Sequence, residues 1–65
     1  MSAANTNALV QFPDGSAHVV SLFEDPVIGQ PLVGVGIDDG WICDRVELAP
    51  PGETEYRLVI LVSGA

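Results

Sequence analysis

The sequence predicts a small all-β domain. The 65-residue chain is rich in Val, and its apolar residues alternate with polar ones between turn signals, as in half-buried strands. Seven Gly and five Pro residues interrupt the chain too often for a helix of useful length. No segment keeps the period of an α-helix. We therefore expect a flexible N-terminal tail at residues 1–7 and a single small β domain at residues 8–65.

Turn signals divide this domain into five expected strands. Asp14-Gly15 is the strongest hairpin signal in the chain. As a two-residue turn it places Val10 opposite Val19 on the core side of the sheet and His18 on the other side. Long proline-containing connections are expected at 24–31 and 49–55. The expected strands are residues 8–12, 17–23, 32–37, 41–48 and 56–62.

The segment Asp38-Asp39-Gly40 leaves the register of the fourth strand open. A two-residue turn turns Trp41 outward and Asp44 inward, which conflicts with burial of a charge. A three-residue loop turns Trp41 and Cys43 inward and makes Arg45 the conflict. A bulge near Asp44 or Arg45 satisfies both halves of the strand. We favour a Trp41 side chain that is at least partly buried, because a small core needs its largest side chain.

Five antiparallel strands in so few residues must curl, because a small flat sheet cannot bury its own apolar face. In strand count, strand spacing and one long loop, residues 8–63 resemble the small SH3-like barrels. This resemblance implies a five-stranded antiparallel meander curled into a barrel. The aromatic cluster of the SH3 ligand groove is absent, so the resemblance implies no peptide-binding residues. The alternative is a half-open β-sheet completed by dimerisation.

Charge excludes several classes of function. The chain has nine Asp or Glu residues and only two basic residues, Arg45 and Arg57, so its net charge is −7. Two arginines cannot build the basic patch that nucleic-acid binding needs, and an anionic membrane surface is disfavoured for the same reason. The chain has no Lys, which excludes Schiff-base and phosphate-loop lysine chemistry. A single Cys and no visible signal peptide favour a cytoplasmic location.

No motif indicates an active site. Cys43 and His18 have the right chemistry for a nucleophile and a base, but nothing in the sequence places them together. Asp38, Asp39 and Asp44 lack the spacing of a calcium loop and are explained by turn chemistry. We therefore expect no enzymatic activity, no cofactor and no metal site.

The apolar fraction of 48% is high for so short a chain, so a second copy or another protein is expected to cover some of it. The sequence thus predicts a non-catalytic acidic protein-interaction or accessory module that forms homo-oligomers. The central residues of the expected strand at 56–62 are apolar on both of its faces. An alternative is an inhibitor or nucleic-acid mimic whose acidic surface binds a basic partner. The expected protein-binding residues are Trp41, Arg45, Val59 and Leu61.

Overall fold

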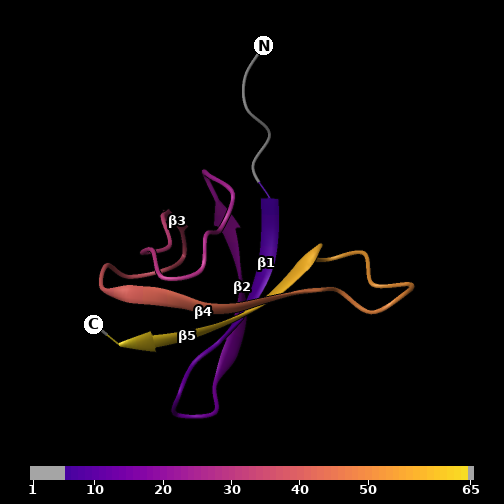
Figure 1. The fold of residues 1–65 in the computed structure, drawn as a ribbon. Coiled ribbons are helices and arrows are strands. Elements are labelled where there is room, and N and C mark those ends of the chain that lie inside the picture. Colours follow the sequence, from indigo (N-terminus) through magenta and orange to yellow (C-terminus); the bar gives the residue numbers. More distant parts are fainter. Residues whose placement is uncertain (1–5, 65) are drawn as a thin grey trace.

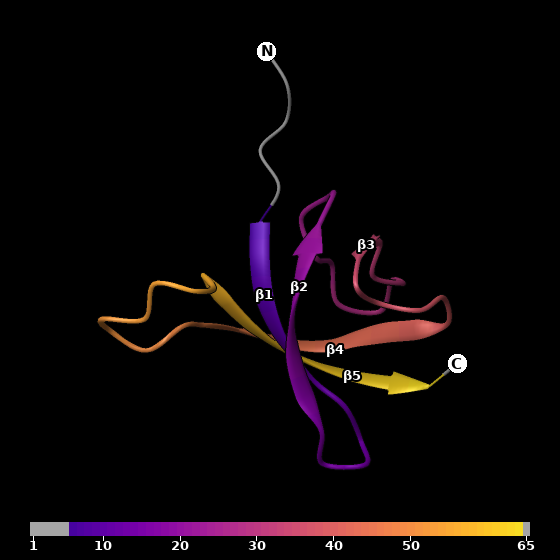
Figure 2. The same ribbon diagram turned by 180° about the vertical axis from the view of Figure 1, so that it is seen from behind.

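A computed structural model describes residues 6–64, which form one strongly twisted five-stranded sheet (Figure 1). The β1–β2 hairpin runs crosswise to the β4–β5 hairpin, as both views show (Figures 1 and 2). Among these residues no helix is long and apolar enough to cross a membrane. The all-β prediction is confirmed. The strands are β1 (Thr6–Gln11), β2 (Ala17–Leu22), β3 (Gly34–Val35), β4 (Trp41–Leu48) and β5 (Leu58–Gly64).

The predicted antiparallel meander is only partly right. The strand order is β3-β2-β1-β5-β4, so three pairs of consecutive strands are neighbours but β3 and β4 are not. Instead β1 pairs in parallel with β5, with Leu9 beside Val59 and Val10 beside Ile60. The remaining pairs are antiparallel. This parallel pairing places β1 and β5 in the middle of the sheet, where each strand has a hydrogen-bonded neighbour along both of its edges.

The sheet is not closed into the predicted barrel, and β3 and β4 are its two edges. The chain just before β3 lies along β4 instead. Pro31 forms an isolated bridge with Ile42, and the Leu32 N–H donates to the carbonyl oxygen of Trp41 at 3.1 Å. The chain then leaves β4 and pairs with β2 at Gly34. Asp39-Gly40 is therefore a turn within a longer connection, not the tip of a tight hairpin.

Gly34 is required at this crossing. A Cβ atom on Gly34 would collide with the carbonyl oxygen of Ser21 and lie 2.9 Å from the Cα of Leu22. The absence of a side chain lets β3 approach β2 closely. β3 is two residues long, where the sequence predicted a strand over residues 32–37.

The first hairpin differs from the prediction by one residue. Val10 pairs with His18 rather than with Val19. The loop has three residues, Pro13 to Gly15, because the Phe12 N–H donates to the Ser16 carbonyl at 2.8 Å. Gly15 takes the positive φ of 94° that such a loop needs. The shift moves His18 to the core side of the sheet and Val19 to the opposite side.

β4 contains a bulge, which the sequence offered as one way to satisfy both halves of the strand. The register of β4 against β5 shifts between Cys43 and Arg45, so Asp44 is the extra residue. Cys43 is buried. Trp41 is half-buried and packed against the core, in agreement with the prediction that its side chain is at least partly buried. Asp44 and Arg45 are both exposed, so neither charge conflicts with the core.

The expected tail at residues 1–7 overlaps β1 by two residues, and residues 1–5 lie outside the described part of the chain.

The hydrophobic core lies on one side of the sheet, here called the inner face. Phe12, Ile37, Trp41, Val46 and Leu58 pack around the buried side chains. Those buried side chains are Ala8, Val10, Val20, Leu22, Leu32, Cys43, Ile60 and Val62.

Candidate functional site

The side of the sheet opposite the core, here called the outer face, carries no charge over four strands. Strand alternation and the pairing register define its members. One row across the sheet contains Val19, Leu9 and Val59, and the next contains Ala17, Gln11 and Leu61. The outer-face positions of β3, β2, β1 and β5 are Val35, Ala17, Val19, Ser21, Asn7, Leu9, Gln11, Val59, Leu61 and Ser63.

Several of these apolar side chains are strongly exposed. Val19 is 41% exposed and Val35 is 61% exposed. The ladder of β2 and β3 continues one step further, because the Phe23 N–H donates to the carbonyl oxygen of Val33 at 3.0 Å. Phe23 is 47% and Val33 is 50% exposed. These four residues form a contiguous apolar patch at the β3 edge, which extends through Leu9 to β5.

Charge returns on the outer face only at β4. Arg45 and Glu47 lie beside Leu61 and Val59 in the register. The Arg45 Nε atom lies 2.7 Å from a Glu47 carboxylate oxygen, so the two side chains form an exposed ion pair. Such exposed ion pairs contribute little to the free energy of unfolding, but the opposite charges of these two side chains cancel at that edge of the sheet.

A hollow of about 560 Å³ opens where β1 ends beside the bulge of β4. Arg45 and Leu61 both line it, and Asp44 lines it from the bulge. The Ser63 hydroxyl donates to a carboxylate oxygen of Asp44 at 3.0 Å and holds that side chain across the strand. The remaining lining residues are Gln11, Phe12, Pro13, Val62 and Ser63.

The four predicted protein-binding residues therefore divide between two places. Arg45, Val59 and Leu61 share the outer face, where Arg45 and Leu61 lie next to each other. Trp41 lies on the inner face and lines a different hollow. The sequence predicted all four as protein-binding residues, and the structure places Trp41 on a different surface from the other three.

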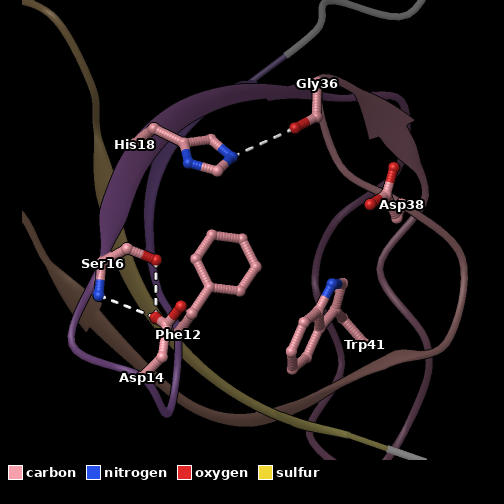
Figure 3. Close-up of a pocket in the computed structure, with 7 residues that line it drawn as sticks. All are labelled: Phe12, Asp14, Ser16, His18, Gly36, Asp38 and Trp41. Carbon is pink, nitrogen blue, oxygen red and sulfur yellow. Dashed lines mark hydrogen bonds between the residues drawn. The ribbon is translucent and has the colours of Figure 1, made fainter.

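This second hollow, here called the aromatic pocket, has a volume of about 270 Å³. The centroid of the Phe12 ring lies 4.8 Å from that of His18 and 4.9 Å from that of Trp41. The planes of Phe12 and Trp41 are inclined at 66°. Figure 3 shows the three rings bordering one space, with Asp38 on the opposite wall and Asp14 beyond Phe12. The lining residues are Phe12, Asp14, Ser16, His18, Gly36, Asp38 and Trp41.

Hydrogen bonds fix two sides of the aromatic pocket. The Asp14 carboxylate accepts from the hydroxyl of Ser16 at 2.6 Å and from its N–H at 2.9 Å. The Ser16 hydroxyl and N–H lower the pKa of Asp14 below its usual value, because they stabilise the ionised carboxylate. The Nε2 atom of His18 lies 3.2 Å from the carbonyl oxygen of Gly36 and donates its proton there.

Sequence reasoning missed this pocket because it turned His18 to the wrong face. The two-residue turn separates His18 from Phe12, whereas the observed three-residue loop brings their rings together. Pro13-Asp14-Gly15 is compatible with this loop, with Gly15 in the left-handed position, but it does not distinguish the three-residue loop from the two-residue turn.

The thiol of Cys43 is not available as a nucleophile. Cys43 is fully buried, and burial raises the pKa of its thiol, with a smaller contribution from the Asp44 carboxylate. The Nε2 atom of His18 is bonded to the carbonyl oxygen of Gly36 and not to the thiol of Cys43. Within residues 6–64 no group of three or more His, Cys, Asp or Glu side chains is arranged to hold a metal ion.

Comparison of the chain with protein-family models, with curated proteins and with solved structures found no match. The function of the chain must therefore be inferred from the chemistry of the outer face and of the aromatic pocket.

Proposed function

We propose that the chain is a non-catalytic cytoplasmic interaction module that associates with a second copy of itself through its outer face. The observation that carries this proposal is the absence of charge over four strands of that face in a chain of net charge −7. The free, buried thiol of Cys43 fits a reducing compartment.

An antiparallel sheet with one wet face normally shows polar side chains on that face. Here the wet face carries Val19, Phe23, Val33 and Val35, each at least 41% exposed. A contiguous exposed apolar patch of this kind is typical of an interaction surface. Further apolar side chains, Leu9, Val59 and Leu61, continue the surface toward the middle of the sheet.

The exposed area predicts a weak dimer. Complete burial of one such side chain is worth about 1.5–3 kcal/mol, and about half of each of the four is still exposed. Two copies would therefore gain roughly 6–12 kcal/mol from these side chains. Association itself costs about 4–15 kcal/mol. These side chains therefore supply at most about 8 kcal/mol of net binding free energy, which corresponds to a dissociation constant of roughly 1 μM or weaker, so the dimer should dissociate on dilution in the micromolar to millimolar range.

A second copy is a suitable occupant because seven of the nine acidic residues lie in connections between strands, and Glu47, which lies on the outer face at β4, is paired with Arg45. Glu24, Asp25, Asp38, Asp39 and Glu55 are exposed and lie in connections between strands. A two-fold interface requires a patch that is complementary to itself, and an uncharged face brings no like charges together when it meets a second copy.

The test is the molar mass in solution, measured by light scattering during size-exclusion chromatography over a range of concentrations. Wild type is expected to pass from monomer to dimer as its concentration rises. Val35→Glu should remain a monomer, because two copies of the new charge would meet at the interface. Leu48→Glu is the matched control, since Leu48 is 83% exposed but lies on the inner-face side of β4.

Two outcomes contradict the proposal. One is a wild-type chain that stays monomeric at the highest soluble concentration. The other is an equal effect of Val35→Glu and Leu48→Glu. Circular dichroism of both variants checks that the sheet is intact, and Val33→Glu, which lies outside the strands, provides a second disruption of the same patch.

A second candidate function, an acidic mimic or inhibitor, is favoured by the distribution of charge. Eight of the nine acidic residues are exposed and Glu53 is half-buried. Binding of a basic partner through these side chains should weaken steeply as salt is added. Binding that is insensitive to salt would instead favour the outer face.

A further inference from the structure

The aromatic pocket combines two features that recognise a positive charge. The Phe12 and Trp41 rings stand at 66° to each other and form a corner, with the His18 ring beside Phe12. A cation in such a corner can lie within about 6 Å of more than one ring centroid, the range of cation–π attraction. Figure 3 shows the carboxylate of Asp38 on the wall that faces these rings.

The charge around the aromatic pocket is negative. Asp14 and Asp38 line it, and neither of the two arginines of the chain does. Asp14 stays ionised because Ser16 holds its carboxylate by two hydrogen bonds. Within residues 6–64, no side-chain hydrogen bond or ion pair engages the Asp38 carboxylate, so its charge can face a ligand. An anion would meet repulsion here.

A metal ion fits less well than an organic cation. Aromatic carbon provides no ligand for a hard cation, which prefers several oxygen atoms. The described residues offer no cluster of three or more metal-ligating side chains. A volume of about 270 Å³ falls at the lower end for ligand pockets and fits one head group rather than a whole cofactor.

We infer that the aromatic pocket binds an organic ammonium group, preferably a quaternary or methylated one, between the Phe12 and Trp41 rings and the carboxylate of Asp38. Methyl groups on the nitrogen would contact the rings, while the spread positive charge would face both the rings and the carboxylate. The pocket lies on the inner-face side of the sheet, so its occupancy does not depend on association through the outer face.

Trp41 reports on this site directly, because it is the only Trp in the chain and its ring lines the pocket. The probe is tetramethylammonium chloride, titrated at constant ionic strength against sodium chloride while Trp41 fluorescence is recorded. We expect a saturable change with a dissociation constant on the order of 1 mM. The uncharged tert-butanol, which has nearly the same shape, should give no saturable change.

Two carboxylates on the same loop provide a matched pair of variants. Asp38 lines the aromatic pocket, whereas the adjacent Asp39 is exposed and does not. Asp38→Asn should weaken tetramethylammonium binding roughly two- to fivefold. Asp39→Asn makes the same change in net charge and should leave binding close to that of wild type. Phe12→Leu should weaken binding roughly two- to fivefold, once circular dichroism shows an intact sheet.

Three results would overturn the inference. These are the lack of any saturable response to tetramethylammonium, equal binding of tert-butanol, and equal weakening by Asp38→Asn and Asp39→Asn. If binding occurs, competition identifies the source of the ammonium group. Tighter binding of a short peptide containing trimethyl-lysine indicates a protein side chain, and tighter binding of choline indicates a free small molecule.

Discussion

The two faces of β5 make a prediction that the sequence alone could not make. Residues 58–62 are all apolar, so either set of alternating side chains could form the core. The structure buries Val62, which is 5% exposed, and turns Val59 to the outer face, where it is half-buried. The same substitution at these two positions, Val→Ala, therefore measures which face is the core while keeping strand propensity constant.

The expected magnitudes differ clearly. Val62→Ala removes two buried carbon groups, each worth about 0.8 kcal/mol, and leaves a small cavity, so it should cost roughly 2–3 kcal/mol. Val59→Ala loses only part of that burial and opens no cavity, so it should cost about 1 kcal/mol or less. A domain of this size rarely has more than about 3–5 kcal/mol of stability. Val62→Ala should thus be close to unfolding.

The assay is urea unfolding followed by circular dichroism, at protein concentrations low enough to keep the chain monomeric. Low concentration matters because Val59 lies on the proposed interface and would acquire a second role in a dimer. Equal losses of unfolding free energy at the two positions, or a larger loss for Val59→Ala, would refute the assignment of the inner face.

Three further predictions follow from single residues. Gly34→Ala should cost more unfolding free energy than a usual surface substitution, because its Cβ would collide with the Ser21 carbonyl; urea unfolding measures this, and a wild-type midpoint would contradict it. The Cys43 thiol should react with Ellman's reagent only at the rate of unfolding, because it is buried and its pKa is raised; rapid labelling of the folded chain would contradict it. The Asp14 carboxyl should titrate below its usual pKa in NMR experiments, so its contribution to stability is present above the unfolded pKa and is lost as the pH falls through the folded one; Ser16→Ala should raise that pKa, and an unchanged value would contradict the hydrogen-bond explanation.

Local patterns predicted the fold class and the fourth strand well. Alternation and turn residues were sufficient for an all-β chain, and β4 begins and ends where the sequence placed it. The bulge at Asp44 followed from one conflict: Trp41 and Cys43 need one register and Val46 another, and only an extra residue satisfies both. The cost of burying the charge of Asp44 or Arg45 is the reason for the bulge, and the pattern of charged and apolar residues in the sequence reveals this cost.

The register of the first hairpin could not be predicted in the same way. Pro13-Asp14-Gly15 fits a two-residue and a three-residue loop, and Gly accepts positive φ in both. β2 offers Val19 to one face and Val20 to the other, so hydrophobic alternation does not choose between them. The aromatic pocket could not be predicted either, because the register of this hairpin decides which face of the sheet His18 occupies.

The strand order could not be predicted from the sequence, for a different reason. No turn residue connects β1 to β5, and their parallel pairing joins segments about 50 residues apart. Only the fit of one apolar strand against another selects it. Alternation does place Val59 and Leu61 on the same side of their strand, because it holds whichever neighbour the strand has.

The central position of β5 also bears on how the chain folds during synthesis. β5 provides the ladder to β1 and the long ladder to β4, together with two of the buried core residues, Ile60 and Val62. A nascent chain that has released only the segments before residue 58 has half of its sheet without a neighbour and its apolar strands exposed. The ribosome must therefore release residues 58–64 before a stable core forms, and until then β1 and β4 are open to pairing with other chains.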